Sequence, residues 1–450
     1  MSPSIIYENG RDGTIAILGV SLPTDRLLQV DFRDGIFTYH VQWLHDARND
    51  RSPSRSAEDS FVVHAPDARI TAATLKGKGI NVGIQVTWSD GTQTTFPGAW
   101  LRALAPMVAK QSLEDGFIGE DCSDNHGWVT DKIDIPEVHF DSIFPQQKPS
   151  VEQSEEISIK ICDMLFHEGK SGIIKVVGLP APDVQSERET RNTIVTKILK
   201  QVFGSVFVHP RRGADLTFNV TDNYGKEKNR GAELHNYRTD VVLLPHCDHA
   251  HYDYPAQVQG LYCLEGESYN TFISSVAVLH TMQQEAPDLY PYLLKSPMVV
   301  GRVAHYYDPP MFQATVEPAA TLMPGFPDQV KRIRWHPHLA GSLVTPFDDF
   351  DMARQAYQKY QEILRRPTHQ LKVLFKPGDL YIWDNFRNLH GRESVISVPR
   401  TSVGQTVPEQ VVSERYRSLQ IKRLKGLVDE SWLVHVPTPK LYDMAKLLGA

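Results

Sequence analysis

The chain has 450 residues, a formal net charge of −7 at pH 7 and a sequence pI near 6.2. Its length allows two or three domains with a large core, and its acidic balance gives no reason to expect nucleic-acid or anionic-membrane partners. Four cysteines without C-x-x-C spacing fit a reducing compartment. The start, MSPSIIYENG, lacks a basic segment and a long apolar run, and no apolar stretch is long enough to cross a bilayer. We therefore expect a soluble, cytoplasmic protein.

The predicted elements divide the chain into two domains and a linker. Short apolar runs between turn residues predict a small β-rich domain over 1–105, with strands near 14–20 and 83–88. Residues 106–150 are predicted to be a linker. The remaining part, 151–450, forms the second and larger domain.

Helical spacing marks several segments of the larger domain. Residues 154–167 and 186–203 are predicted helices, and Ser186 with Glu189 offers a capping box for the second. Residues 350–365 predict an amphipathic helix. A final helix is expected after Pro439.

Runs of β-branched and aliphatic residues predict the strands of this domain. They cover 172–178, 239–246 and, as a pair around a Pro377-Gly378 turn, 372–384. Many strands with a few long helices favour an α+β, mainly β architecture.

Two imidazoles and a carboxylate follow these strands. His246 and Asp248 are two positions apart, so in extended chain both point to one side and can bind one ion. His390 lies far downstream. This set binds Fe(II) on one face and leaves other positions open for substrate and oxygen. His249 and His251 leave a zinc site open as an alternative, and we expect these two histidines to be solvated loop residues.

Longer stretches around these residues resemble one family. HCDHAHYDYPAQVQGLYCLEGE at 246–267, KPGDLYIWDNFRNLHGRES at 376–394 and ERYRSLQIKRL at 414–424 occur in the family's order. They are similar to the γ-butyrobetaine and trimethyllysine hydroxylase group of taurine-dioxygenase-like, 2-oxoglutarate-dependent oxygenases. Weaker matches at 41–50 and 86–102 resemble the small N-terminal domain of that group.

The resemblance implies a fold and a cofactor set. The fold is a double-stranded β-helix, or jelly-roll, catalytic core with helices. In it, His246, Asp248 and His390 hold Fe(II), and 2-oxoglutarate and O2 are the cosubstrates. An unactivated C–H bond of the substrate is oxidised while succinate and CO2 are released.

The family also supplies an arginine beyond the second histidine for the far carboxylate of 2-oxoglutarate. Arg417 matches its Arg-x-Leu pattern, and Arg415, expected on the same side of the same strand, is the alternative. Thr271 is expected to donate its hydroxyl to the same carboxylate. The long interval from His390 to Arg417 contains a segment, 395–413, that is predicted to be an inserted surface loop.

Departures from the family concern the substrate. The cysteine cluster of the carnitine enzymes' N-terminal zinc site is missing, and Ala214, Phe218 and Arg238 occupy the expected aromatic-cage positions. A slip of one residue puts Tyr237 in place of Arg238. An arginine would repel a quaternary ammonium group and suit a carboxylate, although a surface salt bridge explains Arg238 equally well.

We therefore expect oxidation of a small amino acid or carboxylic acid, by hydroxylation or by ring closure such as aziridine formation. Fungal secondary-metabolism members of the group also lack the zinc cluster. A γ-butyrobetaine or trimethyllysine hydroxylase of carnitine biosynthesis, a zinc-binding hydrolase and a non-catalytic barrel stay open as alternatives. The expected partner is a small molecule, and relatives that dimerise leave a homodimer open.

Overall fold

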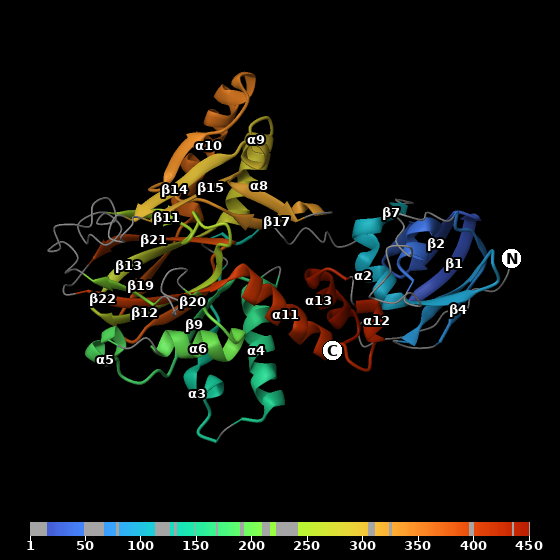
Figure 1. Ribbon diagram of the computed structural model, residues 1–450, viewed down its shortest axis with the longest axis horizontal. Coiled ribbons are helices and arrows are strands. Elements are labelled where there is room, and N and C mark those ends of the chain that lie inside the picture. Colours follow the sequence, from blue (N-terminus) through green and yellow to red (C-terminus); the bar gives the residue numbers. More distant parts are fainter. Residues whose placement is uncertain are drawn as a thin grey trace. The chain divides into compact units, whose positions relative to one another are not determined.

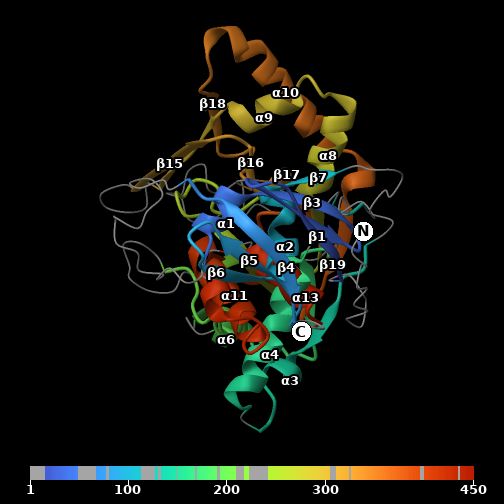
Figure 2. The same ribbon diagram turned by 90° about the vertical axis from the view of Figure 1, so that its right-hand side faces the viewer.

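The computed structural model is drawn in Figures 1 and 2, coloured along the sequence. Its elements separate into two compact units, residues 1–122 with 416–450 and residues 123–415. Among the described residues, no helix is long and apolar enough to cross a bilayer. The structure describes residues 16–48, 67–77, 81–112, 127–129, 133–147, 149–167, 170–189, 193–208, 217–221, 242–304, 311–323, 326–395, 400–433 and 436–449.

The unit that includes the N-terminal segment contains two small antiparallel sheets and several helices. The predicted strands at 14–20 and 83–88 correspond to β1 and β5. Residues 416–450 pack in this unit, where the Trp100 indole donates to the Trp432 carbonyl at 3.0 Å, whereas the sequence interpretation grouped them with 151–450. The first sheet has the order β1 (Ile17–Thr24), β2 (Leu27–Phe32), β3 (Gly35–His40), β7 (Ala109–Ser112), the second β4 (Ile70–Lys76), β5 (Gly83–Trp88), β6 (Gln93–Pro97), and the helices are α1 (Val41–Asp46), α2 (Gly98–Val108), α12 (Glu430–Leu433) and α13 (Thr438–Leu447).

The second unit is built on a six-stranded and a four-stranded sheet (Figure 1). All of their strand pairs are antiparallel except β8 with β9. The six-stranded sheet has the order β10 (Phe218–Thr221), β22 (Thr401–Pro408), β12 (Ala256–Glu265), β20 (Leu380–Asp384), β9 (Ile173–Val177), β8 (Glu137–His139). The four-stranded sheet has the order β11 (Leu243–His246), β21 (Asn388–Val395), β13 (Ser268–Ser274), β19 (Leu371–Phe375).

Alternation along the strands gives the six-stranded sheet an inner and an outer face. Gly260 on β12 faces outward, since a Cβ there would meet Val195 and Leu199 of α6 (Ile194–Phe203). The neighbouring positions of β12 therefore face inward. There, apolar residues of both sheets form one core: Trp128, Ile173, Leu261, Cys263, Phe272, Phe375, Tyr381 and Trp383.

A segment between β13 and β19 forms a further layer with its own core. In it, α8, α9 and α10 lie beside one another (Figure 2). Its elements are α8 (Ser275–Glu285), α9 (Tyr290–Lys295), β14 (Met298–Ala304), β15 (Met311–Glu317), β16 (Ala320–Met323), β17 (Phe326–Ile333), β18 (Ala340–Leu343), α10 (Phe350–Leu364) and short 3-10 helices at Phe347–Asp349 and Pro367–His369.

Several predicted elements are confirmed. The helix expected at 154–167 is α4 (Val151–Phe166), and it begins at a capping box of Ser150 and Gln153. The expected strand at 172–178 is β9. The pair at 372–384 is β19 and β20, joined through Gly378, whose φ of 93° is the left-handed conformation that glycine tolerates. The helices expected at 350–365 and after Pro439 are α10 and α13.

Three predicted elements are wrong. The helix expected over 186–203 is two helices, α5 (Val184–Glu189) and α6, and the cap of α6 is Thr193, whose Oγ1 accepts from the Thr196 N–H. The surface loop expected over 395–413 contains β22, a buried strand between β10 and β12. The strand expected at 414–424 is part of the helix α11 (Glu409–Arg423). A short α3 (Phe140–Ile143) lies in the expected linker.

Candidate metal centre

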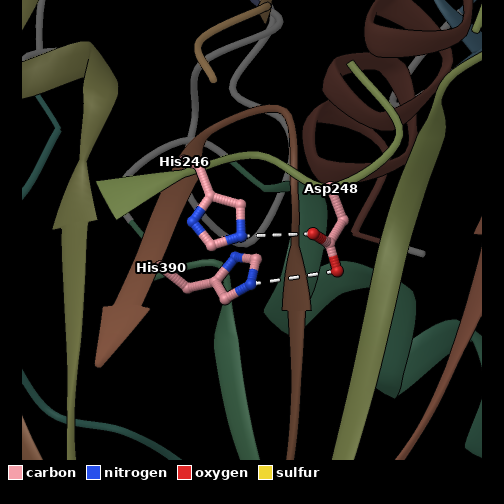
Figure 3. A group of neighbouring side chains, drawn as sticks. All are labelled: His246, Asp248 and His390. Carbon is pink, nitrogen blue, oxygen red and sulfur yellow. Dashed lines mark ion pairs between the residues drawn. The ribbon is translucent and has the colours of Figure 1, made fainter. Parts of the chain in front are cut away.

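Strand pairing brings the two predicted histidine ligands together. His246 ends β11 and pairs directly with His390 on β21, so their ring centroids are 4.4 Å apart. Asp248 follows two residues after His246, with its carboxylate 3.2 Å from His246 Nε2 and 3.9 Å from His390 Nε2 (Figure 3). The three potential ligand atoms lie within 4.8 Å of one another. The two remote segments predicted to share an ion therefore do converge.

The protonation states in this cluster suit metal ligands. Burial acts to raise the pKa of Asp248, but the bond to His246 and the field of His390 bring it well below its usual value. Burial, with the charge of His246, lowers the pKa of His390 to about 3. An ionised carboxylate and a neutral imidazole are the forms that bind metal. His246 Nδ1 lies 2.8 Å from the Leu244 carbonyl, a contact that turns Nε2 toward Asp248.

Two polar side chains hold Asp248 in place. The Gln259 amide donates to Asp248 Oδ2 at 2.7 Å. Asn385, in the turn between β20 and β21, accepts from the Asp248 N–H at 3.1 Å and donates to the Asp248 carbonyl at 3.0 Å. The turn that leads to His390 therefore also fixes the backbone of the carboxylate ligand.

Cys247 points away from the cluster, as expected from strand alternation. Its N–H donates to the Trp335 carbonyl at 2.8 Å, and its Sγ accepts from the Trp335 N–H at 3.2 Å. Burial raises the pKa of the thiol to about 12. The cysteine is thus a packed, unreactive thiol that docks the segment after β17 against the motif.

The expectation that His249 and His251 are solvated is wrong. The His251 side chain is buried, and the His249 ring lies against the rings of Phe207 and Tyr252 at centroid distances of 4.7 and 5.1 Å. Burial lowers the pKa of His249 to about 4 and that of His251 to about 3. Within the described residues, only His246, Asp248 and His390 form a group with metal-ligand geometry.

His336 is a neighbour that the sequence did not reveal. It follows β17 and is buried, with its ring centroid 4.7 Å from that of His246. Burial, with the nearby His246, keeps its pKa well below the usual value. No motif marks this residue, since only the docking of the segment through Cys247 brings it to the cluster.

The predicted cosubstrate residues are placed elsewhere. Arg417 lies on the helix α11 and donates to the carbonyls of Val436 and Leu433, the latter at 2.9 Å. Arg415, on the same helix, donates to the Val202 carbonyl at 3.3 Å. Because the segment is helical, the prediction that both arginines share one side of a strand is wrong.

Thr271 does not share a face with the metal-site histidine. It lies on β13 opposite Gly391, while its neighbour Phe272 pairs with His390. Alternation therefore directs the Thr271 side chain to the other side of the sheet from His390. Thr271 is buried there rather than placed in a turn, so nothing supports its predicted contact with the cosubstrate.

Two buried arginines near the core were missed by the sequence interpretation. Arg392 is two residues beyond His390 on β21, so both side chains share one face. Arg400 directly precedes β22, and its charge acts on the Cys263 thiol, whose pKa burial raises to about 11. The signal was present in HGRES and in VPRTSV, but the second stretch was taken for a surface loop.

The predicted substrate residues are partly described. Phe218 on β10 pairs with Gly404 on β22, and its ring lies where a Cβ of Gly404 would stand. Gly404 in turn pairs with the core residue Leu261, so Phe218 faces the inner side of the sheet. Ala214, Tyr237 and Arg238 lie outside the described residues.

Comparisons with known proteins agree with the site. Residues 194–403 match the family model for the taurine catabolism dioxygenase TauD, TfdA family. Trimethyllysine dioxygenase from Bos taurus is 27% identical over 372 residues, which cover 81% of this chain and 79% of the relative. The chain is thus a TauD-like, Fe(II)/2-oxoglutarate-dependent dioxygenase.

Two further proteins are similar to this dioxygenase, one in sequence and one among solved structures. γ-Butyrobetaine dioxygenase from Pseudomonas sp. (strain AK-1) is 23% identical, with 82% of this chain and 86% of the relative covered. A solved asparagine oxygenase, in complex with Fe(II), 2S,3S-3-hydroxyasparagine and succinate, has a TM-score of 0.42 at 16% identity and covers 60% of this chain and 93% of its own.

The donor set fits the cofactors of such a dioxygenase. Two imidazoles and one carboxylate are the ligands that suit Fe(II) and leave positions for 2-oxoglutarate and O2. A structural zinc site would instead fill all four positions with protein ligands. The three-residue group therefore does not fit a closed structural zinc site, and the match to the dioxygenase family model favours iron over a catalytic zinc, which also takes three protein ligands.

Proposed function

We propose that this dioxygenase oxidises an unactivated C–H bond of a small amino acid or carboxylic acid, by hydroxylation or by ring closure such as aziridine formation. Succinate and CO2 are the coproducts. The observation that carries the iron chemistry is the convergence of His246, Asp248 and His390 to within 4.8 Å at the pairing of β11 with β21. The substrate class rests on the sequence, in which Ala214 and Arg238 stand at two of the expected aromatic-cage positions.

We also propose that the catalytic core is a double-stranded β-helix. Two mainly antiparallel sheets that enclose a shared core, with the two histidine ligands on adjacent strands, suit the double-stranded β-helix of this family. The β-rich residues before the core then form a separate N-terminal domain.

Each residue of the site has a defined part in the proposed reaction. Fe(II), when bound with 2-oxoglutarate, supplies the activation of O2 and the oxidation of the C–H bond. The chain supplies the ligands, and Gln259 and Asn385 hold Asp248 as a fixed anion. The apolar core around Trp383 and Phe272 excludes water from the reacting atoms.

We assign the far carboxylate of 2-oxoglutarate to Arg400 in place of Arg417. Ser402 pairs with Cys263, a member of the core between the sheets, so the two-residue repeat along the chain directs Arg400 to the same inner face. The Arg400 side chain is buried, and a guanidinium can bind a carboxylate through two parallel N–H bonds. Arg417 already donates to the backbone carbonyls of Leu433 and Val436.

The aromatic content of the expected cage positions supports a small substrate without a quaternary ammonium group. Phe218 is the one described aromatic residue of the expected cage positions. One ring provides little of the attraction that several ring faces give a trimethylammonium group. The relatives' names favour the second candidate, a trimethyllysine or γ-butyrobetaine hydroxylase.

A succinate-release assay with Fe(II) and 2-oxoglutarate separates these functions. The panel contains free amino acids, small carboxylic acids, trimethyllysine and γ-butyrobetaine, and mass spectrometry of the products distinguishes added oxygen from loss of two hydrogens. We expect stimulation by an amino or carboxylic acid. Stimulation by the betaines alone would establish the second candidate instead, and a wild-type protein that binds zinc but ignores 2-oxoglutarate would overturn the oxygenase.

A further inference from the structure

The two carboxylate oxygens of Asp248 have different surroundings. Oδ1 lies 3.2 Å from His246 Nε2. Oδ2 lies 3.9 Å from His390 Nε2 but accepts a hydrogen bond of 2.7 Å from the Gln259 amide. Both oxygens point toward the imidazoles (Figure 3), and Oδ2 in addition accepts the hydrogen bond of an amide. The carboxylate is therefore presented asymmetrically.

The direction of the Gln259 side chain is set by its strand. Gln259 pairs with Trp383 on β20 and with Thr406 on β22, in the middle of the six-stranded sheet. Its neighbour Gly260 faces Val195 on the outer side, so Gln259 faces inward. Only 1% of the residue is exposed, which leaves the side chain little freedom to take another rotamer.

The other end of the same amide lacks a partner. Gln259 Oε1 is buried and, among the described residues, accepts no hydrogen bond, and the same holds for the hydroxyl of Thr406 across the ladder. Reversing the amide would place Oε1 against the Asp248 carboxylate, an acceptor against an acceptor. The orientation with N–H toward Asp248 is therefore required.

We propose that Gln259 is a positioning residue for the metal centre. Its N–H holds Asp248 Oδ2, so that Oδ1 becomes the oxygen offered to the metal and the carboxylate binds through one atom. This inference rests on the proposed function, because it takes His246, Asp248 and His390 as the ligands.

Removal of the amide, with a matched control elsewhere, tests this role. Gln259→Met keeps the length of the side chain and removes the N–H donor. Gln405→Met is the control, because Gln405 is equally buried but contacts Thr196 of α6 and the backbone of Thr406, on the outer side of the sheet. Co(II) serves as the probe, titrated by its visible absorption, and thermal unfolding of the metal-free proteins measures stability.

We expect Gln259→Met to weaken Co(II) binding roughly 10- to 100-fold, the range for residues that orient metal ligands, and to change the absorption spectrum of the bound ion. Gln405→Met should lower the unfolding temperature with less than about a twofold change in Co(II) affinity. A second variant, Gln259→Glu, keeps the shape but replaces the donor, and should also weaken binding.

Three results would overturn the inference in distinguishable ways. Wild-type affinity and spectrum in both Gln259 variants would show that the amide does not orient the ligand. An equal loss of affinity in Gln405→Met would assign the effect to general packing of the sheet. A wild-type protein that binds no Co(II) would overturn the proposed metal centre itself, and the positioning role with it.

Discussion

The metal ligands and the arginines illustrate two kinds of sequence signal. His246 and Asp248 are tied together by a local two-residue repeat, and β21 pairs with β11 to bring His390 beside them. Arg417 was chosen by its sequence pattern alone, and its segment is the helix α11. The strand that lies inside the sheet is β22, which begins directly after Arg400. The ligand motif remained correct although some surrounding elements were predicted wrongly, whereas an arginine chosen from a short sequence pattern was misplaced because the element that carries it was wrong.

The largest expected effect comes from removing a metal ligand. His390→Ala should abolish Fe(II)-dependent succinate release, because two remaining ligands bind the ion far more weakly than three. The loss should exceed the roughly 10- to 100-fold effect of residues that only orient ligands. Titration with Co(II) and the succinate assay measure both consequences.

His369→Ala is the control for this variant. His369 is also buried, but its Nε2 contacts Thr281 Oγ1 at 3.3 Å, away from the cluster. It should retain Co(II) affinity. Full Fe(II)-dependent activity of His390→Ala would refute the assignment of His390 as a metal ligand.

The assignment of the arginines gives the next largest effect. Arg400→Met should raise the KM for 2-oxoglutarate by roughly 10- to 150-fold, which corresponds to the about 1.5–3 kcal/mol of a hydrogen bond to a charged group. Arg417→Met should leave this KM unchanged and lower stability, since the carbonyls of Leu433 and Val436 lose their donor. The opposite outcome, a KM effect in Arg417→Met alone, would restore the sequence-based choice.

The correct and the wrong predictions show which elements carry a signal in their own sequence. The alternating and apolar runs that become β5, β9, β19 and β20, and the amphipathic α10, carry local signals that were sufficient. The strand β22 was missed because its residues, TSVGQTVP, are polar and end in proline. Its partners β10 and β12 bury it, and pairing between segments so distant is not encoded in the strand itself.

The site shows the same limit. The ligands were predicted, but the environment of the neighbouring histidines was not. His251 was taken as solvated because adding it to the ligands would close the coordination sphere that an iron oxygenase keeps open, whereas its side chain is buried in the folded chain. His336 joins the cluster only through the backbone contacts between Trp335 and Cys247. Tertiary packing, rather than local composition, decides such positions.

Burial of His251 predicts a pH dependence of stability. Its pKa is about 3 in the folded protein against 6.5 in the unfolded chain, so the unfolded state binds more protons between these values. The stability it contributes is therefore present above about pH 6.5 and is lost as the pH falls toward 3. Chemical denaturation of the metal-free protein at pH 7 and pH 5 should show a decrease on the order of a few kcal/mol. In His251→Phe this decrease should be smaller, whereas an unchanged slope would mean that the ring is hydrated.

The prediction with the smallest expected effect tests whether Phe218 packs on β22 at the inner face of the six-stranded sheet. The Phe218 ring lies where a Cβ of Gly404 would stand, so Gly404→Ala should displace the ring and destabilise the protein by about 1–3 kcal/mol. Phe218→Ala removes the clash, and the double variant should then be less unstable than the sum of the single changes. Denaturation midpoints of the four proteins give this coupling. Additive effects would mean that the Phe218 ring does not contact Gly404. The evidence that Phe218 and β22 face the inner side of the sheet would then be lost.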